Sequence, residues 1–208
     1  TLATEHSRLG IPLLLAARPM GLPLSPWALA ASWDEGLARQ LGAVAAEAVL
    51  GKGANCLSGP RIAVGTDRHA AAGATIASSQ AHLAARLAAA LSSGAGRNET
   101  GGMNRALAIP AIEEPAASAL RCALDLVHGA DVMALDCAAL NREAALKAGF
   151  SGLLVAECRR LTAMLADHFA TTSARARVEA AEKAIAEGLL AEHEIDGAVR
   201  GVLAVKHA

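Results

Sequence analysis

The sequence contains very few aromatic residues: its 208 residues include two Trp, two Phe and no Tyr. Because 53% of the residues are nevertheless hydrophobic, the core must be built from small aliphatic side chains. Proteins that bind single-stranded nucleic acid without sequence preference stack the bases on aromatic side chains. Carbohydrate clefts likewise usually stack sugar faces on Trp or Tyr. The scarcity of aromatic residues therefore argues against both kinds of site.

No excess of charge of either sign is present. Lys and Arg number 19 and Asp and Glu number 20, which gives a formal net charge of −1. Such a balance provides no overall field that would attract nucleic acid or an anionic membrane. The longest hydrophobic runs, such as Ile11–Ala17, have the length of a strand and not of a membrane span. We therefore expect neither nucleic acid nor a membrane as a partner.

The cysteines are few and dispersed: Cys56, Cys122, Cys137 and Cys158 form no CxxC pair. This spacing argues against a zinc site or a redox dithiol, and scattered thiols in Ala- and Leu-rich surroundings are typical of reduced core residues. Residues 1–10 include acidic and basic side chains and lack the pattern of a signal peptide. These features predict a cytoplasmic protein without a metal or other cofactor.

Short aliphatic runs alternate with helical patterns along the chain, which predicts βα units around a parallel sheet in a single domain, residues 1–208. Two segments interrupt this alternation: residues 61–75 are predicted to be a loop, and the Gly-rich stretch 92–104 is predicted to be the most flexible part. Strands are predicted at residues 10–17, 54–57, 131–135 and 152–157, and helices at 32–50, 78–92, 115–128, 142–148, 174–190 and 194–206.

The helix that starts near residue 32 has a recognisable first turn. Ser32 and Glu35 are expected to form a capping box, in which each side chain accepts a hydrogen bond from the other residue's amide. Pro23 and Pro26 are expected to lie in the loop before this helix. Gly59 and Pro60 are expected to stop the second strand.

In a parallel sheet of this kind, site residues lie at the carboxyl ends of the strands. Arg18, Asp136 and Glu157 occupy such positions. Glu157 is the strongest candidate, because a carboxylate that ends an apolar strand is costly to bury without a partner. The alternatives for Glu157 are an ion pair with Arg159 or Arg160, or exposure to solvent.

Asp136 is a candidate acid/base or binding group beside Glu157; alternatively, it caps the helix near Arg142. If Arg18 lines the cleft, its charge favours an anionic ligand or neutralises Glu157, and the alternative is exposure to solvent. His69 stands out in its loop, although a lone histidine in such a loop is commonly just exposed.

Six segments carry a resemblance to a known family: 8–15, 26–34, 53–55 ahead of Gly59 and Pro60, 98–100 with Arg105, 149–157 and 194–206. In this order along the chain, they resemble the (β/α)8 barrel of glycoside hydrolase family 3, which contains β-glucosidases and β-N-acetylhexosaminidases. The resemblance implies a TIM-barrel-like α/β fold, here incomplete or reduced in strand number, with Glu157 at the nucleophile position. Asn98 and Arg105 join Arg18, Arg61 and His69 as candidate ligand-binding residues.

The sequence also departs from the family at the sugar-binding positions. The family's Lys-His dipeptide would fall near Ser93 and Gly94, the nucleophile Asp is Glu157, and the Trp that follows it is Cys158. The longer side chain of Glu157 would displace the attacking oxygen by about 1 Å, which can cost on the order of 10²-fold in rate. Each lost hydroxyl-binding group also weakens transition-state stabilisation.

We therefore expect a degenerate relative in which ordinary β-glycoside hydrolysis is lost or replaced, either a pseudoenzyme or a site recruited for a nonsugar metabolite. The alternative is an active retaining β-glycosidase that uses Glu157 as its nucleophile. The expected ligand is a small molecule, either a sugar or a derived metabolite.

The family's first strand and helix have no counterpart ahead of residue 10. A barrel short of strands has open edges and an uncovered aliphatic face. We therefore expect a homodimer or a partner chain to cover this gap. Trp27 and Trp33 are expected to belong to the scaffold.

Overall fold

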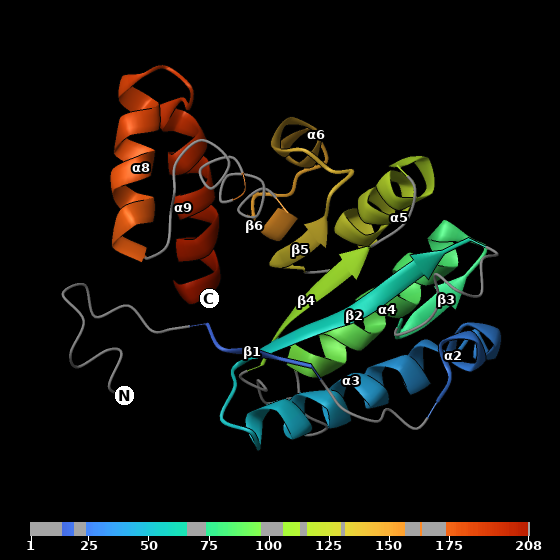
Figure 1. Cartoon of the computed structure of the whole chain (residues 1–208). Coiled ribbons are helices and arrows are strands. Elements are labelled where there is room, and N and C mark those ends of the chain that lie inside the picture. The colour runs from blue at the N-terminus through green and yellow to red at the C-terminus, as the bar shows by residue number, and fades with distance from the viewer. Residues whose placement is uncertain are drawn as a thin grey trace.

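A computed structural model describes residues 14–18, 24–65, 74–96, 106–112, 116–129, 132–156, 163 and 174–207, which include thirteen labelled helices and strands (Figure 1). In chain order these are β1 (Ala16–Ala17), α2 (Pro26–Ser32), α3 (Glu35–Leu50), β2 (Cys56–Val64), β3 (Ile76–Ser78), α4 (Ala81–Gly96), β4 (Leu107–Ile112), α5 (Ala116–Gly129), β5 (Ala134–Cys137), α6 (Arg142–Lys147), β6 (Leu153–Leu154), α8 (Ala174–Ala186) and α9 (Glu192–His207).

The strands form one parallel sheet in the order β1-β2-β4-β5-β6, which follows their order in the chain. The short β3 pairs with the last residues of β2, and β1 pairs with its first residues. The predicted α/β architecture, a parallel sheet of alternating strands and helices, is therefore confirmed. Its outermost described strands offer backbone groups to a partner, but the homodimer stays a prediction.

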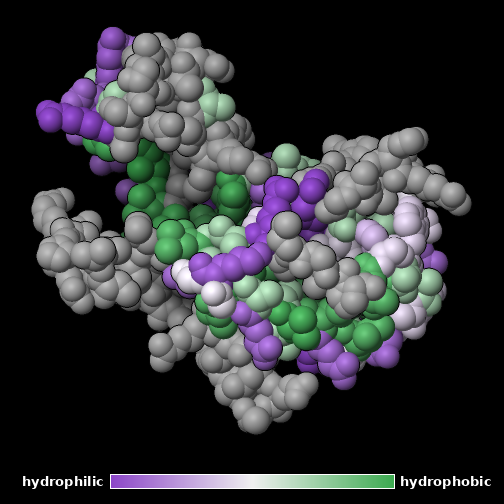
Figure 2. All heavy atoms as spheres, turned by 60° about the horizontal axis from the view of Figure 1, so that its bottom comes forward, coloured by the Kyte–Doolittle hydropathy of each residue, from purple (hydrophilic) through white to green (hydrophobic). Residues whose placement is uncertain are grey.

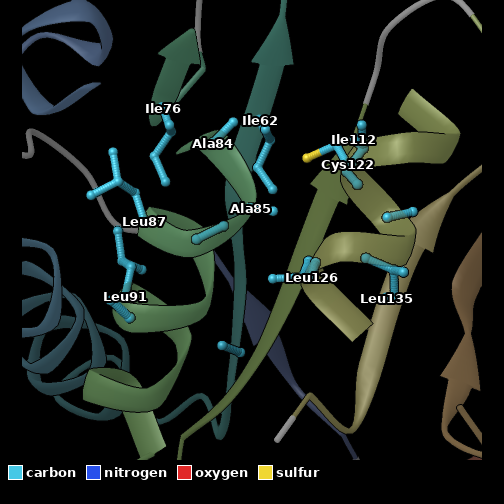
Figure 3. Packing of buried hydrophobic residues seen from close by; sticks show 14 of the residues in the cluster. Ile62, Ile76, Ala84, Ala85, Leu87, Leu91, Ile112, Cys122, Leu126 and Leu135 are labelled. Carbon is cyan, nitrogen blue, oxygen red and sulfur yellow. The ribbon is translucent and has the colours of Figure 1, made fainter. Parts of the chain in front are cut away.

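Three helices cover one face of the sheet. Figure 1 shows α3, α4 and α5 side by side along this face, and α4 contacts both of its neighbours. Figure 3 shows Ala84 of α4 near the strand residues Ile62 and Ile76, Leu87 and Leu91 on the other side of the same helix, and Leu126 of α5 near Leu135. This cluster consists largely of Ala, Leu, Ile and Val, as the composition predicts.

Two glycines bring α3 and α4 into backbone contact. A Cβ atom at Gly42 would overlap the carbonyl oxygen of Leu91, and one at Gly94 would overlap the carbonyl oxygen of Arg39. The helices are therefore packed too closely for even a methyl group at either crossing point.

The chain ends in two helices near the β6 end of the sheet. Gly201 of α9 packs on the backbone of Leu153, and Val202 joins the apolar cluster on the face opposite α3–α5. Ala180, Ala184 and Leu190 form the small core between α8 and α9. Both helices were predicted.

The helix start near residue 32 differs from the prediction. Ser32 ends α2, a helix that starts at Pro26 behind the N-cap Ser25, and its hydroxyl donates to the carbonyl of Leu29. Asp34 caps α3, because its carboxylate accepts from the amide of Leu37 at 3.0 Å. The capping box is wrong, and Pro26 is the first residue of a helix, a position that needs no amide hydrogen.

Two strands run through prolines, and one of these prolines, Pro60, was expected to end its strand. β2 continues beyond Gly59 and Pro60 to Val64, so residues 61–64, which were predicted to be part of a loop, belong to a strand. In β4, which the sequence did not predict, Pro110 lies level with Pro60. A bulge, in which Ser58 and Gly59 oppose one residue of β4, interrupts the ladder just there. Prolines are tolerated at such irregularities because they have no amide hydrogen to donate.

The remaining predicted segments agree in part. The helix predicted at 78–92 extends to Gly96, so the first residues of the predicted flexible stretch are helical, while 97–105 lie outside the described residues. The strand predicted at 152–157 is only Leu153–Leu154, and Val155 and Ala156 are already helical.

On the face of the molecule that Figure 2 shows, the hydrophobic surface of the described residues is discontinuous. Figure 2, which brings the lower side of Figure 1 forward, shows it as patches divided by hydrophilic side chains. In the part of the chain that the structure describes, no helix combines the length and the apolar character needed to cross a membrane.

The close contact between α3 and α4 leads to a stability prediction. We expect Gly42→Ala and Gly94→Ala each to lower the free energy of unfolding by about 1–3 kcal/mol, because the added methyl group forces the backbones apart. Gly197→Ala is the matched control: a Cβ there meets nothing within 4 Å, so the better helix former should stabilise by up to about 1 kcal/mol. Urea unfolding measures all three. Equal effects at the three positions would contradict this packing.

Candidate functional site

The described strands contain only two charged residues, Arg61 in β2 and Asp136 in β5. The pairing of the strands places them in one row of the sheet, because Arg61 is level with Ala111 of β4 and Ala111 is level with Asp136. Residues level with one another in a parallel sheet point to the same face. The two opposite charges therefore share a face, with one methyl side chain between them.

This row lies on the face opposite α3, α4 and α5. Ile62, Ile112 and Cys137, which immediately follow the three row residues, all belong to the core under the helices. Because side chains alternate along a strand, Arg61 and Asp136 point away from that core. Their backbones are two strand spacings apart, about 10 Å, which is within the combined reach of the two side chains.

The row lies near the carboxyl ends of the strands. Ala111 and Asp136 are each one residue from the end of their strand. On the other side of Arg61, Thr75 extends the row: its hydroxyl accepts from the Arg61 amide at 3.2 Å, and its amide donates to the Arg61 carbonyl at 2.7 Å. Arg61 and Asp136 are both half-buried. A guanidinium, a hydroxyl and a carboxylate thus line one partly exposed strip that can both donate and accept hydrogen bonds.

The predicted site residues fall into three groups. Asp136 and Arg61 lie in the row, although Arg61 was predicted in a loop and is part of β2. Arg18 follows β1 and is exposed. Glu157, His69, Asn98 and Arg105 lie outside the described residues.

The alternative role for Asp136 as a helix cap is wrong. Asn141 caps α6, its side-chain oxygen accepting from the Ala144 amide at 2.8 Å. Asp136 instead lies within β5, one residue before Cys137 at its end. Its side chain is half-buried, at the position level with Ala111 in the row.

The asparagine of the family-like segment 53–55 has a structural role. The side chain of Asn55 accepts from the Leu15 amide at 2.7 Å, just before β1. Its backbone amide donates to the Leu15 carbonyl, and its carbonyl accepts from Leu107 at the start of β4. Asn55 therefore ties three strands together at the amino end of the sheet, far from the row.

The sequence alone gives no direct signal for the row. Arg61, Ala111 and Asp136 are widely separated in the chain, and their alignment depends on the bulge beside Gly59. Of the three, Ala111 carries no chemistry of its own. To identify the row from the sequence, both the strand β4 and its register with β2 and β5 would have to be predicted.

The described cysteines do not form a reactive site. Burial raises the pKa of the Cys56 thiol to about 11. Burial, together with the nearby Cys137 and Asp125, raises that of Cys122 to about 12, and burial also raises the pKa of Cys137. No cluster of three His, Cys, Asp or Glu side chains suitable for a metal ion occurs among the residues placed by the structure.

The cysteine pKa values predict slow alkylation and alkaline instability. At pH 8, a pKa raised from 9.0 to about 11 leaves Cys56 with about 100-fold less thiolate than an ordinary cysteine, so iodoacetamide should label it only after unfolding. The pKa of the Cys56 thiol is higher in the folded chain than in the unfolded chain. Its contribution to the free energy of unfolding is therefore complete below about pH 9 and is lost as the pH rises through 11.

Peptide mass spectrometry measures the labelling, and urea unfolding at pH 8, 10 and 11 measures the loss of stability. The variant Cys56→Ala should lose less stability between pH 8 and 11 than the unmodified chain. Rapid labelling of Cys56 in the folded protein at pH 8 would contradict its burial.

No protein-family model matches this sequence, and a search of curated proteins finds no match either.

Proposed function

We propose that this chain is a shortened relative of the glycoside hydrolase family 3 barrel in which ordinary β-glycoside hydrolysis has been lost or replaced, and that it binds a small hydroxylated ligand across the Arg61–Ala111–Asp136 row. The observation that supports this proposal is the strand register, which places the two charged residues of the described strands in one row. The relationship to the family rests on the sequence segments described above.

The chemistry of the row favours binding over hydrolysis. A retaining glycosidase needs two carboxyl groups about 5–5.5 Å apart, one of them protonated to act as the acid. Beside Asp136 the row offers a guanidinium, which favours the ionised form of a carboxylate. An ionised Asp136 can accept hydrogen bonds from hydroxyl groups, while Arg61 donates to a ligand oxygen.

The arrangement of the strands is consistent with part of a barrel wall. The main strand order follows the chain, and α3, α4 and α5 lie along the same face. In a doubly wound sheet the strand order reverses, whereas in a barrel it follows the chain. The strand order therefore favours a barrel, although α9 packs beside β6 on the face opposite α3–α5, where a regular barrel has no helix. On this proposal the row faces the interior of an incomplete barrel, at the end where barrel enzymes hold their ligands.

Hydrolysis is tested with p-nitrophenyl β-D-glucopyranoside and p-nitrophenyl N-acetyl-β-D-glucosaminide. We expect no release of p-nitrophenol above the rate in buffer, because the family's hydroxyl-binding groups are missing. Release that is abolished in Glu157→Gln would instead establish the alternative, a retaining β-glycosidase with Glu157 as its nucleophile.

Ligand binding is tested by calorimetry with D-glucose, N-acetyl-D-glucosamine and D-gluconate. We expect at least one of them to bind, and Arg61→Met and Asp136→Asn each to weaken that binding about tenfold or more, because each removes a charged hydrogen-bonding group. Lys52→Met and Glu47→Gln are the controls, since they remove one charge of each sign from exposed positions away from the row.

The same variants distinguish a ligand site from a structural ion pair. A structural pair predicts that each single variant loses stability in urea, that the double variant recovers part of it, and that no ligand binds. That combination would overturn the proposal. A ligand site predicts lost binding with little loss of stability.

A further inference from the structure

We propose that this chain forms a two-fold homodimer in which the outer flank of α3 packs, antiparallel, on the same flank of a second copy. Figure 1 shows α3 at the end of the row formed by α3, α4 and α5. The outer flank is the side of α3 that is turned away from α4, and it consists of Leu37, Gln40, Val44 and Ala48. Because it lies on the helix-covered side of the sheet, the inference does not depend on the function proposed for the Arg61–Ala111–Asp136 row.

The direction of the outer flank follows from the contact between α3 and α4. A Cβ at Gly42 would overlap the carbonyl oxygen of Leu91, so Gly42 marks the side of α3 that faces α4. Gln40 and Val44 are each two residues from Gly42, which is about 200° around the helix axis, and they therefore point away from α4. The other two flank residues lie on the same side, since they are three and four residues from these.

The outer flank is uncharged and open to solvent. Val44 is 55% exposed, and Gln40 and Ala48 are exposed as well. Leu37 is half-buried, whereas the residues of α3 that face α4 and the sheet are buried. Three of the four flank residues are apolar, although this side of the helix packs on no other described helix. An apolar strip of this kind on a surface helix is typical of an interaction site.

Leu15 extends the apolar strip near the carboxyl end of α3. Its carbonyl accepts hydrogen bonds from the amides of Asn55 and Cys56, at the start of β2. Ala17 packs on the core beneath the helices and Leu14 packs on the opposite face, so alternation places Leu15 on the helix side. The described chain leaves this side chain 51% exposed. A second copy against α3 would cover it.

One antiparallel register brings matching groups of two copies together. With a two-fold axis beside the middle of α3, Val44 of each copy lies opposite Val44 of the other, and Leu37 lies opposite Ala48 of the second copy. At the rim, the side-chain amide of Gln40 can donate to the carboxylate of Glu47 in the second copy. A two-fold interface uses the same surface on both copies, and an uncharged strip meets no like charge when it faces itself.

The charges at the two ends of α3 favour the antiparallel orientation. Asp34 caps the start of the helix and Lys52 follows its end, and both are exposed. In the register just described, Asp34 of each copy lies opposite Lys52 of the other. A parallel pair would instead place like charges and like ends of the helix dipole together. The neighbouring Glu35 pairs with Arg86 of its own chain.

The length of α3 determines how strong the dimer is. Its 16 residues extend over about 24 Å. Two such helices packed side by side give a contact below the roughly 1,200–2,000 Å² of a standard stable interface. We therefore expect a reversible dimer with a dissociation constant of about 10–100 µM. The charged row stays open in this dimer, because the contact is made on the helix side of the sheet.

Sedimentation velocity of the whole chain between about 2 and 400 µM should show a reversible change from monomer to dimer. Val44→Asp should raise the dissociation constant at least tenfold, because it places two carboxylates opposite each other at the axis. Val178→Asp is the matched control: this valine of α8 is 59% exposed, and its replacement should leave the dimer unchanged. Urea unfolding of the monomer at about 2 µM should be the same for both variants, since both valines are exposed in the single chain.

An exchange of charge tests the antiparallel register. Gln40→Glu places a carboxylate opposite Glu47 of the second copy and should weaken the dimer, whereas Gln40→Glu combined with Glu47→Lys should restore it. Within one chain these two residues are about two helix turns apart, so restoration reports a contact between copies.

Three results would overturn the proposal. The unmodified chain could stay monomeric over the whole concentration range. A dimer could form that Val44→Asp and Val178→Asp weaken equally, or that the exchange of charge does not restore, which would place the interface elsewhere. Larger assemblies could grow with concentration, which would require a head-to-tail contact and not a two-fold one.

Discussion

The packing of α4 is the constraint on which the described structure depends. Gly42 and Gly94 let α4 approach α3 to backbone contact. At this distance Ala84 of α4 lies near Ile62 of β2 and Ile76 of β3, and α4 still contacts α5 on its other side. A gap this narrow has room for Ala, Leu, Ile and Val, but larger aromatic rings would separate the layers. The scarcity of aromatic residues and the closeness of the helices are therefore two aspects of one packing arrangement.

The position of α4 also decides on which face of the sheet the charged row lies. Its inner side packs on the sheet, so the charged row must lie on the opposite face, beyond a layer of buried aliphatic side chains. Its first turn lies beside the α2–α3 corner, and there the ion pair between Arg86 and Glu35 joins the two helices next to Trp33.

Local sequence signals predicted most helices, because helix periodicity and its stop signals act over a few residues. α6, α8 and α9 lie where the sequence placed them. The errors arose where a local signal was overruled by a neighbour in space. Pro60 and Pro110 would normally end a strand, but a bulge at the same level accommodates both. Likewise, Ser32 matches a capping box, yet it belongs to the preceding helix, whose left-handed end at Trp33 leaves the cap of α3 to Asp34.

By itself, the sequence determined the α/β class, the aliphatic character of the core and the absence of a dominant charge, because composition and short-range periodicity are sufficient for these. It also singled out Asp136 and Arg61, but as members of a larger set of unrelated positions. Only the tertiary structure decided that these two share a row, since strand register across β4 is a long-range property. It likewise decided that Trp33, expected in the scaffold, is exposed beside a pocket. The burial of a side chain depends on which elements pack over it, and residues adjacent in sequence do not determine that.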